Sequence, residues 1–128
     1  MVIGVGVDMV EVARIQRALE DPKIGQRFRD RVYTGSEIQY CEKRLRKYES
    51  YAGRFAAKEA VMKALGHGWG SRMGWLDIEI VSRPGGKPEV CLHNKASTLA
   101  SELGVRHLSV SITHTQHYAM AYLIAEGE

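Results

Sequence analysis

The stretch that decides the fold is Arg54-Phe55-Ala56-Ala57-Lys58-Glu59-Ala60-Val61-Met62-Lys63-Ala64-Leu65-Gly66. It is rich in strong helix formers, and Val61 is its only β-branched residue. Gly66 can end a helix, because glycine readily adopts the left-handed conformation that follows the last turn. We therefore predict a helix over this stretch.

One face of the predicted helix carries both apolar and charged side chains. Phe55, Glu59, Met62 and Lys63 recur at helical spacing and lie on a single stripe. Glu59 and Lys63 can form a surface ion pair of roughly 0.2–0.5 kcal/mol. They can also supply a carboxylate and an ammonium to a binding site, and the helix alone favours the ion pair.

Length and composition indicate an ordinary globular protein. With 128 residues, 45% hydrophobic and 26% charged, the chain is predicted to be a single domain over residues 1–128. Cys41 and Cys91 are too few for a disulfide framework, which favours a reducing compartment. The N-terminus has no signal-peptide pattern, and no apolar run is long enough to span a membrane. We expect a cytoplasmic location.

The segments before the long helix alternate in a way that predicts one strand and several helices. From Val2 to Val10, Gly4, Gly6 and Asp8 share one strand face. Two glycines in a strand indicate close backbone approach or packing, and we expect them to leave this face open. Asp8 can be the N-cap of a helix or a metal ligand. Helices are then predicted over 11–20, from Pro22 onward, and from 34–37 to about 48, with the long helix starting near 49 or 50.

The segments after the long helix predict strands around one more helix. The glycine-punctuated stretch 67–75 can wrap a ligand, or its tryptophans can cover the edge of the core. Strands are predicted over 76–82, 88–92, 107–113 and 118–126, and Asn94 is predicted to cap a helix over 95–103. This order is typical of an α+β fold in which a largely antiparallel sheet packs against helices.

The formal charge of +3 is unevenly distributed. Between Arg14 and Arg54 there are eleven Lys or Arg against six Asp or Glu. Such a segment suits an acidic partner, either a nucleic acid or an acidic protein, although a solvated helical face has the same composition.

The residues that can carry chemistry point to a hard cation. His114 and His117 are the nearest approach to a zinc motif, and no second group of ligands has the required spacing. No Gly-x-Ser-x-Gly or Walker motif is present. Asp8, Glu59 and Lys63 remain, and Mg²⁺ takes one or two carboxylates together with waters and substrate phosphates. A lysine beside it supplies a point charge for phosphate oxygens.

Three blocks in order resemble one enzyme family. They are Gly4-Val5-Gly6-Val7-Asp8, Arg54-Phe55-Ala56-Ala57-Lys58-Glu59-Ala60-x-x-Lys63-Ala64 and Val110-Ser111-Ile112-Thr113-His114-Thr115. Together with Gly86-Lys87-Pro88 they resemble the 4′-phosphopantetheinyl transferase superfamily, in its short trimeric branch of holo-acyl-carrier-protein synthases. The longer, two-lobed members have a further carboxylate where this chain has Val10, so a water is expected to replace it.

The resemblance implies both the site and the reaction. The positions of Asp8 and Glu59 bind Mg²⁺ in that family, and that of Lys63 contacts phosphate. The positions that help hold the 3′-phosphoadenosine end of coenzyme A are those of Arg54, Gly86, Pro88, Thr113 and His114. A serine hydroxyl of the carrier attacks the β-phosphate, phosphopantetheine is transferred, and adenosine 3′,5′-bisphosphate leaves. Glu59, directly or through a water on the metal, is the candidate base.

The resemblance also implies partners. The family's acyl carrier protein is small, helical and strongly acidic, and the positions of Arg14, Arg27 and Phe28 belong to its docking surface. Arg17, Arg44 and Arg46 are added to that surface because they lie near in sequence. A homotrimer with sites between subunits and a role in fatty acid biosynthesis are implied as well.

Two other functions compete with the transferase on the residues alone. A basic α+β module that binds nucleic acid would need aromatic side chains among the basic ones on a sheet face, whereas Tyr40 and Tyr48 fall on predicted helices. A Mg²⁺-dependent phosphohydrolase would use the same carboxylates on water. The three-block resemblance favours the transferase, without nucleic acid or membrane as a partner.

Overall fold

The computed structural model describes residues 1–66 and 73–128. The elements in chain order are β1 (Val2–Glu11), α1 (Val12–Glu20), α2 (Gly25–Val32), α3 (Gly35–Glu42), α4 (Lys47–Ala64), the 3₁₀ helix η1 (Trp75–Asp77), β2 (Ile78–Ser82), β3 (Pro88–Leu92), α5 (Asn94–Glu102), β4 (His107–His114) and β5 (Tyr118–Glu126). No helix in the two described ranges is both long and apolar enough for a membrane crossing. Most of the predicted loop 67–75 lies outside the described residues.

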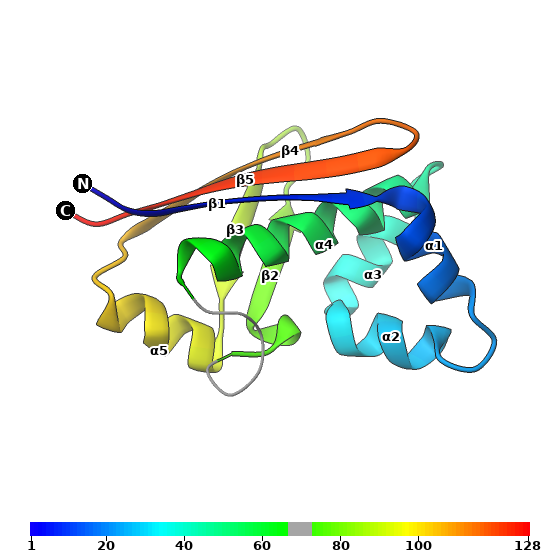
Figure 1. Ribbon diagram of the computed structural model, residues 1–128, viewed down its shortest axis with the longest axis horizontal. Coiled ribbons are helices and arrows are strands. Elements are labelled where there is room, and N and C mark those ends of the chain that lie inside the picture. Colours follow the sequence, from blue (N-terminus) through cyan, green and yellow to red (C-terminus); the bar gives the residue numbers. More distant parts are fainter. Residues whose placement is uncertain (67–72) are drawn as a thin grey trace.

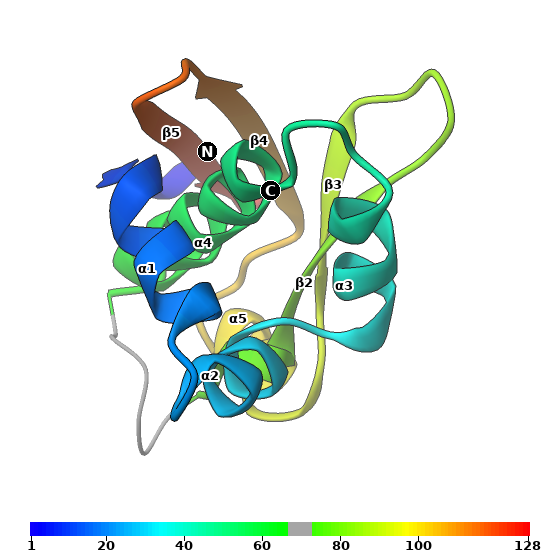
Figure 2. The same ribbon diagram turned by 90° about the vertical axis from the view of Figure 1, so that its right-hand side faces the viewer.

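Two antiparallel sheets surround α4, which confirms the predicted α+β fold. One sheet has the strand order β1-β5-β4, and β2 and β3 form a separate hairpin. The three long strands run along one side of α4, with the N- and C-termini next to each other at one end (Figure 1). Figure 2 shows α4 enclosed by this sheet, the β2–β3 hairpin and the helices α1 to α3.

Small residues on the inner face of the sheet let α4 approach it closely. A Cβ atom on Gly6 would lie 1.9 Å from the Ala60 carbonyl oxygen, and one on Gly4 would lie 2.1 Å from that of Ala64. This confirms the close backbone approach that the two glycines predict. The face that bears Asp8 is not left open, because α4 packs against it. The outer face carries exposed apolar side chains instead, among them Val5 and Val7.

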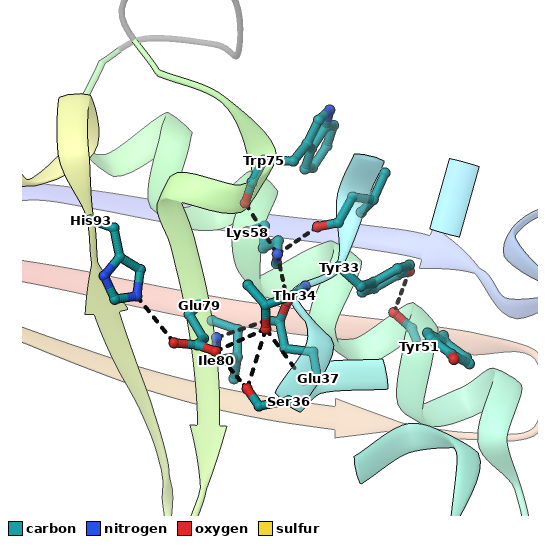
Figure 3. Close-up of polar contacts among 11 residues, drawn as sticks. Tyr33, Thr34, Ser36, Glu37, Tyr51, Lys58, Trp75, Glu79, Ile80 and His93 are labelled. Carbon is teal, nitrogen blue, oxygen red and sulfur yellow. Dashed lines mark hydrogen bonds and ion pairs between the residues drawn. The ribbon is translucent and has the colours of Figure 1, made fainter. Parts of the chain in front are cut away.

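A buried ion pair joins α4 to its neighbours (Figure 3). The Lys58 ammonium lies 2.7 Å from Glu37 Oε1, and both side chains are fully buried. Lys58 also donates to the carbonyls of Val32 and Trp75, at 2.6 and 3.1 Å. Glu37 Oε2 accepts from the Ile80 amide at 2.8 Å. Lys58 lies in α4 and Glu37 in α3, and their backbone partners lie at the end of α2, in η1 and in β2. The ion pair and its hydrogen bonds therefore connect five segments of the chain.

A cluster of aromatic side chains packs around Phe55 of α4. Phe55 stacks on Trp75 with ring centroids 5.0 Å apart and on Phe28 at 6.5 Å. Trp75 is buried, so of its two predicted roles the structure places it at the edge of the core. The Tyr33 hydroxyl donates to the Tyr51 carbonyl at 2.9 Å, which ties the end of α2 to α4 (Figure 3).

Two helix boundaries before the core differ from the prediction. The helix predicted to reach residue 48 ends at Glu42, and α4 begins at Lys47 after a turn. No glycine or proline marks this break. The helix predicted from Pro22 begins at Gly25, because Asp21 Oδ1 accepts hydrogen bonds from the next two free amides and holds a turn there.

Two boundaries after the core are shifted as well. The strand predicted from residue 76 starts at Ile78, because Leu76 belongs to η1 and is exposed. His93, not Asn94, occupies the N-cap position of α5, and Asn94 has a positive φ of 50°. The Thr34–Glu37 start of α3 is a capping box, as its sequence indicates.

We predict that Gly6→Ala destabilises the fold by about 1–3 kcal/mol, because the added methyl group must push α4 away from β1. Urea unfolding measures this change. Gly35→Ala is the matched control, since a Cβ atom there meets nothing within 4 Å. Equal stability of the two variants would contradict the close contact between β1 and α4.

Candidate functional site

Asp8 and Lys63 meet where β1 crosses α4. Lys63 Nζ donates to Asp8 Oδ1 at 3.1 Å and to the Val7 carbonyl at 3.0 Å. Asp8 lies within β1, three residues before the N-cap position of α1 at Glu11, so the alternative role of Asp8 as a helix N-cap is wrong. Among the described residues the ion-pair partner of Lys63 is Asp8, which comes from a different element.

Glu59 lies close enough to Asp8 and Lys63 for both charges to shift the pKa of its carboxyl group. Burial raises the pKa of the Glu59 carboxyl, and the negative charge of Asp8 raises it further. Lys63 and Arg14 act in the opposite direction. Asp8 of β1, distant in sequence, therefore converges with Glu59 and Lys63 on one side of α4.

The carboxylates of Asp8 and Glu59 suit a hard cation whose remaining ligands are waters and substrate phosphates. In the part of the chain that the structure describes, no three His, Cys, Asp or Glu side chains are grouped so as to hold a metal ion. Two carboxylates are enough for Mg²⁺, which keeps waters and binds substrate phosphates. The raised pKa of Glu59 fits such a role, because a bound cation would stabilise the ionised form.

A second group of predicted residues lines a cleft of about 500 Å³. Arg54, Pro88 and His114 lie in its wall. The other lining residues are Tyr40, Lys43, Arg44, Leu45, Arg46, Glu49, Ser50, Gly53, Ser82 and Ile112. With Arg54, the lining includes four lysine or arginine side chains and one carboxylate, Glu49, so the cleft suits an anion.

An adjoining cavity of about 490 Å³ reaches the β2–β3 turn and is lined by Gly86. It shares Tyr40, Arg44, Ser82 and Pro88 with the first cleft, so the two cavities adjoin.

Two side chains in the cleft are fixed by polar contacts. His114 Nδ1 lies 2.8 Å from Oε1 of Glu49, whose other oxygen is 3.9 Å from Arg46 Nη1. Arg54 is only 5% exposed, and its Nη2 donates to Ser82 Oγ at 2.7 Å. Arg54 Nε is buried and has no hydrogen-bond partner among the described residues. A buried guanidinium with a free N–H is suited to an oxyanion.

The structure does not bring the two groups together within one chain. Arg54 and Glu59 are five residues apart on α4 and project about 140° from each other around the helix axis. In the sheet, β5 separates β1, which carries Asp8, from β4, which carries His114. Thr113 is exposed and alternates with the cleft residue Ile112, so it lies on the outer face of the sheet.

The residues predicted to dock a carrier lie on the side of Glu59. The Arg14 guanidinium lies over the Phe55 ring at 5.6 Å, and Phe28 is half-buried against the same ring. Arg27 is exposed on α2. Arg44 and Arg46, grouped with them only by sequence, line the cleft instead.

Sequence reasoning missed Tyr40, Glu49 and Ser82. Glu49 and its partner His114 are 65 residues apart, and no spacing rule links them. Tyr40 and Ser82 have ordinary positions in a helix and a strand, so only the tertiary arrangement reveals them.

Comparison with known proteins gives consistent matches over nearly the whole chain. The model of the 4′-phosphopantetheinyl transferase superfamily matches residues 4–123. The chain is 48% identical to the holo-[acyl-carrier-protein] synthase of Solibacter usitatus, covering 99% of this chain and 100% of that protein. It is also 48% identical to the synthase of Moorella thermoacetica, covering 95% and 92% respectively.

Solved structures match equally well. The holo-[acyl-carrier-protein] synthase of Neisseria meningitidis superposes with a TM-score of 0.87 at 32% identity, covering 98% of this chain and 99% of that one. The synthase of Helicobacter pylori in complex with coenzyme A gives 0.83 at 33% identity, covering 95% and 99%.

We predict that Glu59→Gln raises the melting temperature of the metal-free protein at about pH 8 and changes it little at about pH 4. The folded-state pKa of Glu59 lies above its unfolded value, so folding binds protons. The ionised carboxylate therefore costs stability once the pH exceeds the folded pKa, and glutamine removes that cost. Thermal melts with a chelator measure the effect, with the exposed Glu11→Gln as control. A lower melting temperature at about pH 8 would show that ionised Glu59 stabilises the fold as an ion-pair partner.

Proposed function

The chain belongs to the 4′-phosphopantetheinyl transferase superfamily, and from that membership we propose that it transfers the 4′-phosphopantetheine group from coenzyme A to a serine of an apo acyl carrier protein. The names of its relatives support the acceptor, and the complex of the Helicobacter pylori synthase supports coenzyme A as donor. The observation that carries the proposal is the convergence of Asp8, Glu59 and Lys63 between β1 and α4.

The proposed reaction is a phosphoryl transfer. The serine oxygen forms a bond to the β-phosphorus of coenzyme A, the bond from that phosphorus to the bridging oxygen breaks, and adenosine 3′,5′-bisphosphate leaves with the bridging oxygen. Such a reaction needs positioning and charge neutralisation above all. In this proposal Lys63 supplies a positive charge to the diphosphate, and Glu59 accepts the serine proton. Burial raises the pKa of the Glu59 carboxyl, which favours its role as a base.

Asp8 and Glu59 are the residues that would hold Mg²⁺. Bound there, the ion would neutralise the charge of the diphosphate and orient it as a Lewis acid. In this arrangement Lys63 has to exchange its contact with Asp8 Oδ1 for one with phosphate, which a flexible, exposed side chain can do.

The nucleotide end of coenzyme A belongs, in this proposal, to the cleft. Arg54 and His114 line it, and Gly86 and Pro88 form its continuation at the β2–β3 turn. The positive side chains in the lining of the cleft support the binding of a phosphorylated nucleotide.

The carrier docks, in this proposal, over α1 and α2 next to Glu59. Arg14 and Arg27 are exposed there and supply positive charge for an acidic protein, while Phe28 contributes apolar surface. We place this activity in fatty acid biosynthesis and in the cytoplasm.

We also propose a homotrimer in which neighbouring chains share each site. The outer face of the three-stranded sheet presents exposed Val5, Val7, Met9, Tyr118, Met120 and Tyr122. In register with them β4 adds Ser109, Ser111 and Thr113. A contiguous apolar face of this kind favours burial against another protein surface. It lacks Lys and Arg, which argues against nucleic acid stacking on its tyrosines.

A site shared between chains also explains why the carboxylate group and the cationic cleft lie apart within one chain. The carboxylates lie on the β1 side of α4, whereas the cleft lies against β2, β3 and β4. Juxtaposed chains can place the cleft of one beside Asp8 and Glu59 of the next. Thr113, on the outer face, would then reach coenzyme A from the interface.

Mass spectrometry of the carrier tests the function directly. We expect apo carrier protein, incubated with this protein, coenzyme A and Mg²⁺, to gain the mass of one phosphopantetheine, and Glu59→Gln to lose nearly all of this activity while remaining folded. A carrier of unchanged mass with nucleotide released would indicate a phosphohydrolase. No reaction and no nucleotide released would indicate a binding protein.

Mixing two impaired variants tests the shared site. Asp8→Asn and His114→Ala damage different halves, so co-assembly into trimers should restore about a quarter of the sites by random association. We therefore expect the unfolded and refolded mixture to be more active than the sum of its components. Activity equal to the sum, in trimers shown by light scattering to be mixed, would place the whole site within one chain.

A further inference from the structure

The ammonium group of Lys63 is held by two oxygen atoms of β1. Lys63 Nζ donates a hydrogen bond to Asp8 Oδ1 at 3.1 Å and another to the Val7 carbonyl oxygen at 3.0 Å. Glu59 lies four residues before Lys63, at the spacing at which a glutamate and a lysine commonly pair on a helix. Among the described residues Lys63 pairs with Asp8 instead. The ion pair therefore joins α4 to β1 and does not serve the helix alone.

The oxygens that hold Lys63 are of the kind that hold a hard cation. Carboxylate and carbonyl oxygens are the ligands that suit Mg²⁺ and Mn²⁺. The Asp8 side chain is only 17% exposed, so most of its surface is already covered by protein atoms, with the ammonium at Oδ1. Two cations on the same carboxylate oxygen repel each other. A divalent ion can therefore use Oδ1 only after Lys63 has left it.

Lys63 can leave Asp8 when another anion is present. Its side chain is 55% exposed, and an ammonium on a flexible four-carbon stem can change partners without movement of the helix. The fully buried Lys58, which is fixed by Glu37 and two backbone carbonyls, has no such freedom. A diphosphate offers Lys63 several anionic oxygens in exchange for one carboxylate.

We propose that Lys63 is a stand-in for the divalent ion in the free protein and that it leaves Asp8 when coenzyme A binds. The diphosphate attracts the ammonium and so opens Asp8 to the metal ion. By linkage, occupation of Asp8 by a metal ion releases Lys63 for the diphosphate, and each ligand raises the affinity for the other. This inference rests on the proposed function, and it adds that Lys63 keeps the carboxylate site closed until the substrate is present.

Binding of Mn²⁺ to the free protein tests the stand-in. Free Mn²⁺ gives an electron paramagnetic resonance signal that the bound ion loses, so a titration measures affinity without turnover. A site that is open about one tenth of the time loses about tenfold in apparent affinity. We therefore expect Lys63→Met to bind Mn²⁺ about tenfold more tightly than the wild type. Lys63→Arg keeps a cation on a long side chain and is expected to stay within about twofold of the wild type.

Arg14→Met is the matched control for loss of a nearby positive charge. The Arg14 charge also acts on Glu59, but its guanidinium lies over the Phe55 ring and not at Asp8. An exposed charge that makes no contact with the metal ligands is largely screened, so we expect this variant to change the affinity for Mn²⁺ less than about twofold.

Coenzyme A should remove the difference between the wild type and Lys63→Met. No transfer occurs without a carrier, so Mn²⁺ can be titrated while coenzyme A saturates each protein, and binding of Mn²⁺ to coenzyme A alone is measured in parallel. Only the wild type has an ammonium to displace from Asp8. Its affinity for Mn²⁺ should therefore rise about tenfold more than that of Lys63→Met when coenzyme A is added.

Three results would overturn the stand-in and leave the proposed function intact. The first is equal affinity of the wild type and Lys63→Met for Mn²⁺ without coenzyme A. The second is equal tightening by Lys63→Met and Arg14→Met, and the third is Lys63→Arg binding as tightly as Lys63→Met. A wild type that binds neither Mn²⁺ nor coenzyme A would overturn the proposed function as well. If Lys63→Met does not fold, Lys63→Gln takes its place, with the same expected result.

Discussion

The buried ion pair between Lys58 and Glu37 fixes the position of α4, on which the rest of the structure depends. Both charges are shielded from water, and burial lowers the pKa of the Lys58 ammonium while Glu37 opposes that change. Such a pair adds little net stability over an apolar pair, but loss of one partner costs about 3–5 kcal/mol because a buried charge is left alone. Its hydrogen bonds reach α2, η1 and β2, so it sets the rotation of α4 about its own axis. Glu59 follows Lys58 directly, and its direction is therefore set by the same contact.

The rotation of α4 distributes its polar residues over two sides. One side faces β1, where glycines permit contact between backbones and bring Glu59 and Lys63 to Asp8. The other side directs Arg54 into the cleft beside Ser82. Burying a guanidinium N–H group without a hydrogen-bond partner costs free energy, so packing of the core alone does not account for Arg54. In the proposed trimer, a long anionic substrate would contact the carboxylate site of one chain and the cationic cleft of its neighbour.

Much of this arrangement could be predicted from the sequence, and the exceptions have physical reasons. The long helix, the first strand and the final hairpin follow from periodicity, and the family blocks name Asp8, Glu59 and Lys63. The glycines Gly4 and Gly6 indicate close backbone approach, which the structure confirms. Periodicity cannot tell what covers a strand face, so the expectation that this face is open was wrong. The break after Glu42 has no glycine or proline to mark it. The placement of Tyr40 in the cleft depends on contacts across elements, which no local pattern encodes.

We propose that Asp8 and Glu59 hold one divalent ion beside the diphosphate of coenzyme A. Crystals grown with Mn²⁺ and coenzyme A test it most directly, because anomalous scattering locates the ion without reference to any assumed site. We expect a peak within coordination distance of both carboxylates and of a diphosphate oxygen. A peak elsewhere, or bound coenzyme A whose diphosphate lies away from these two side chains, would contradict it.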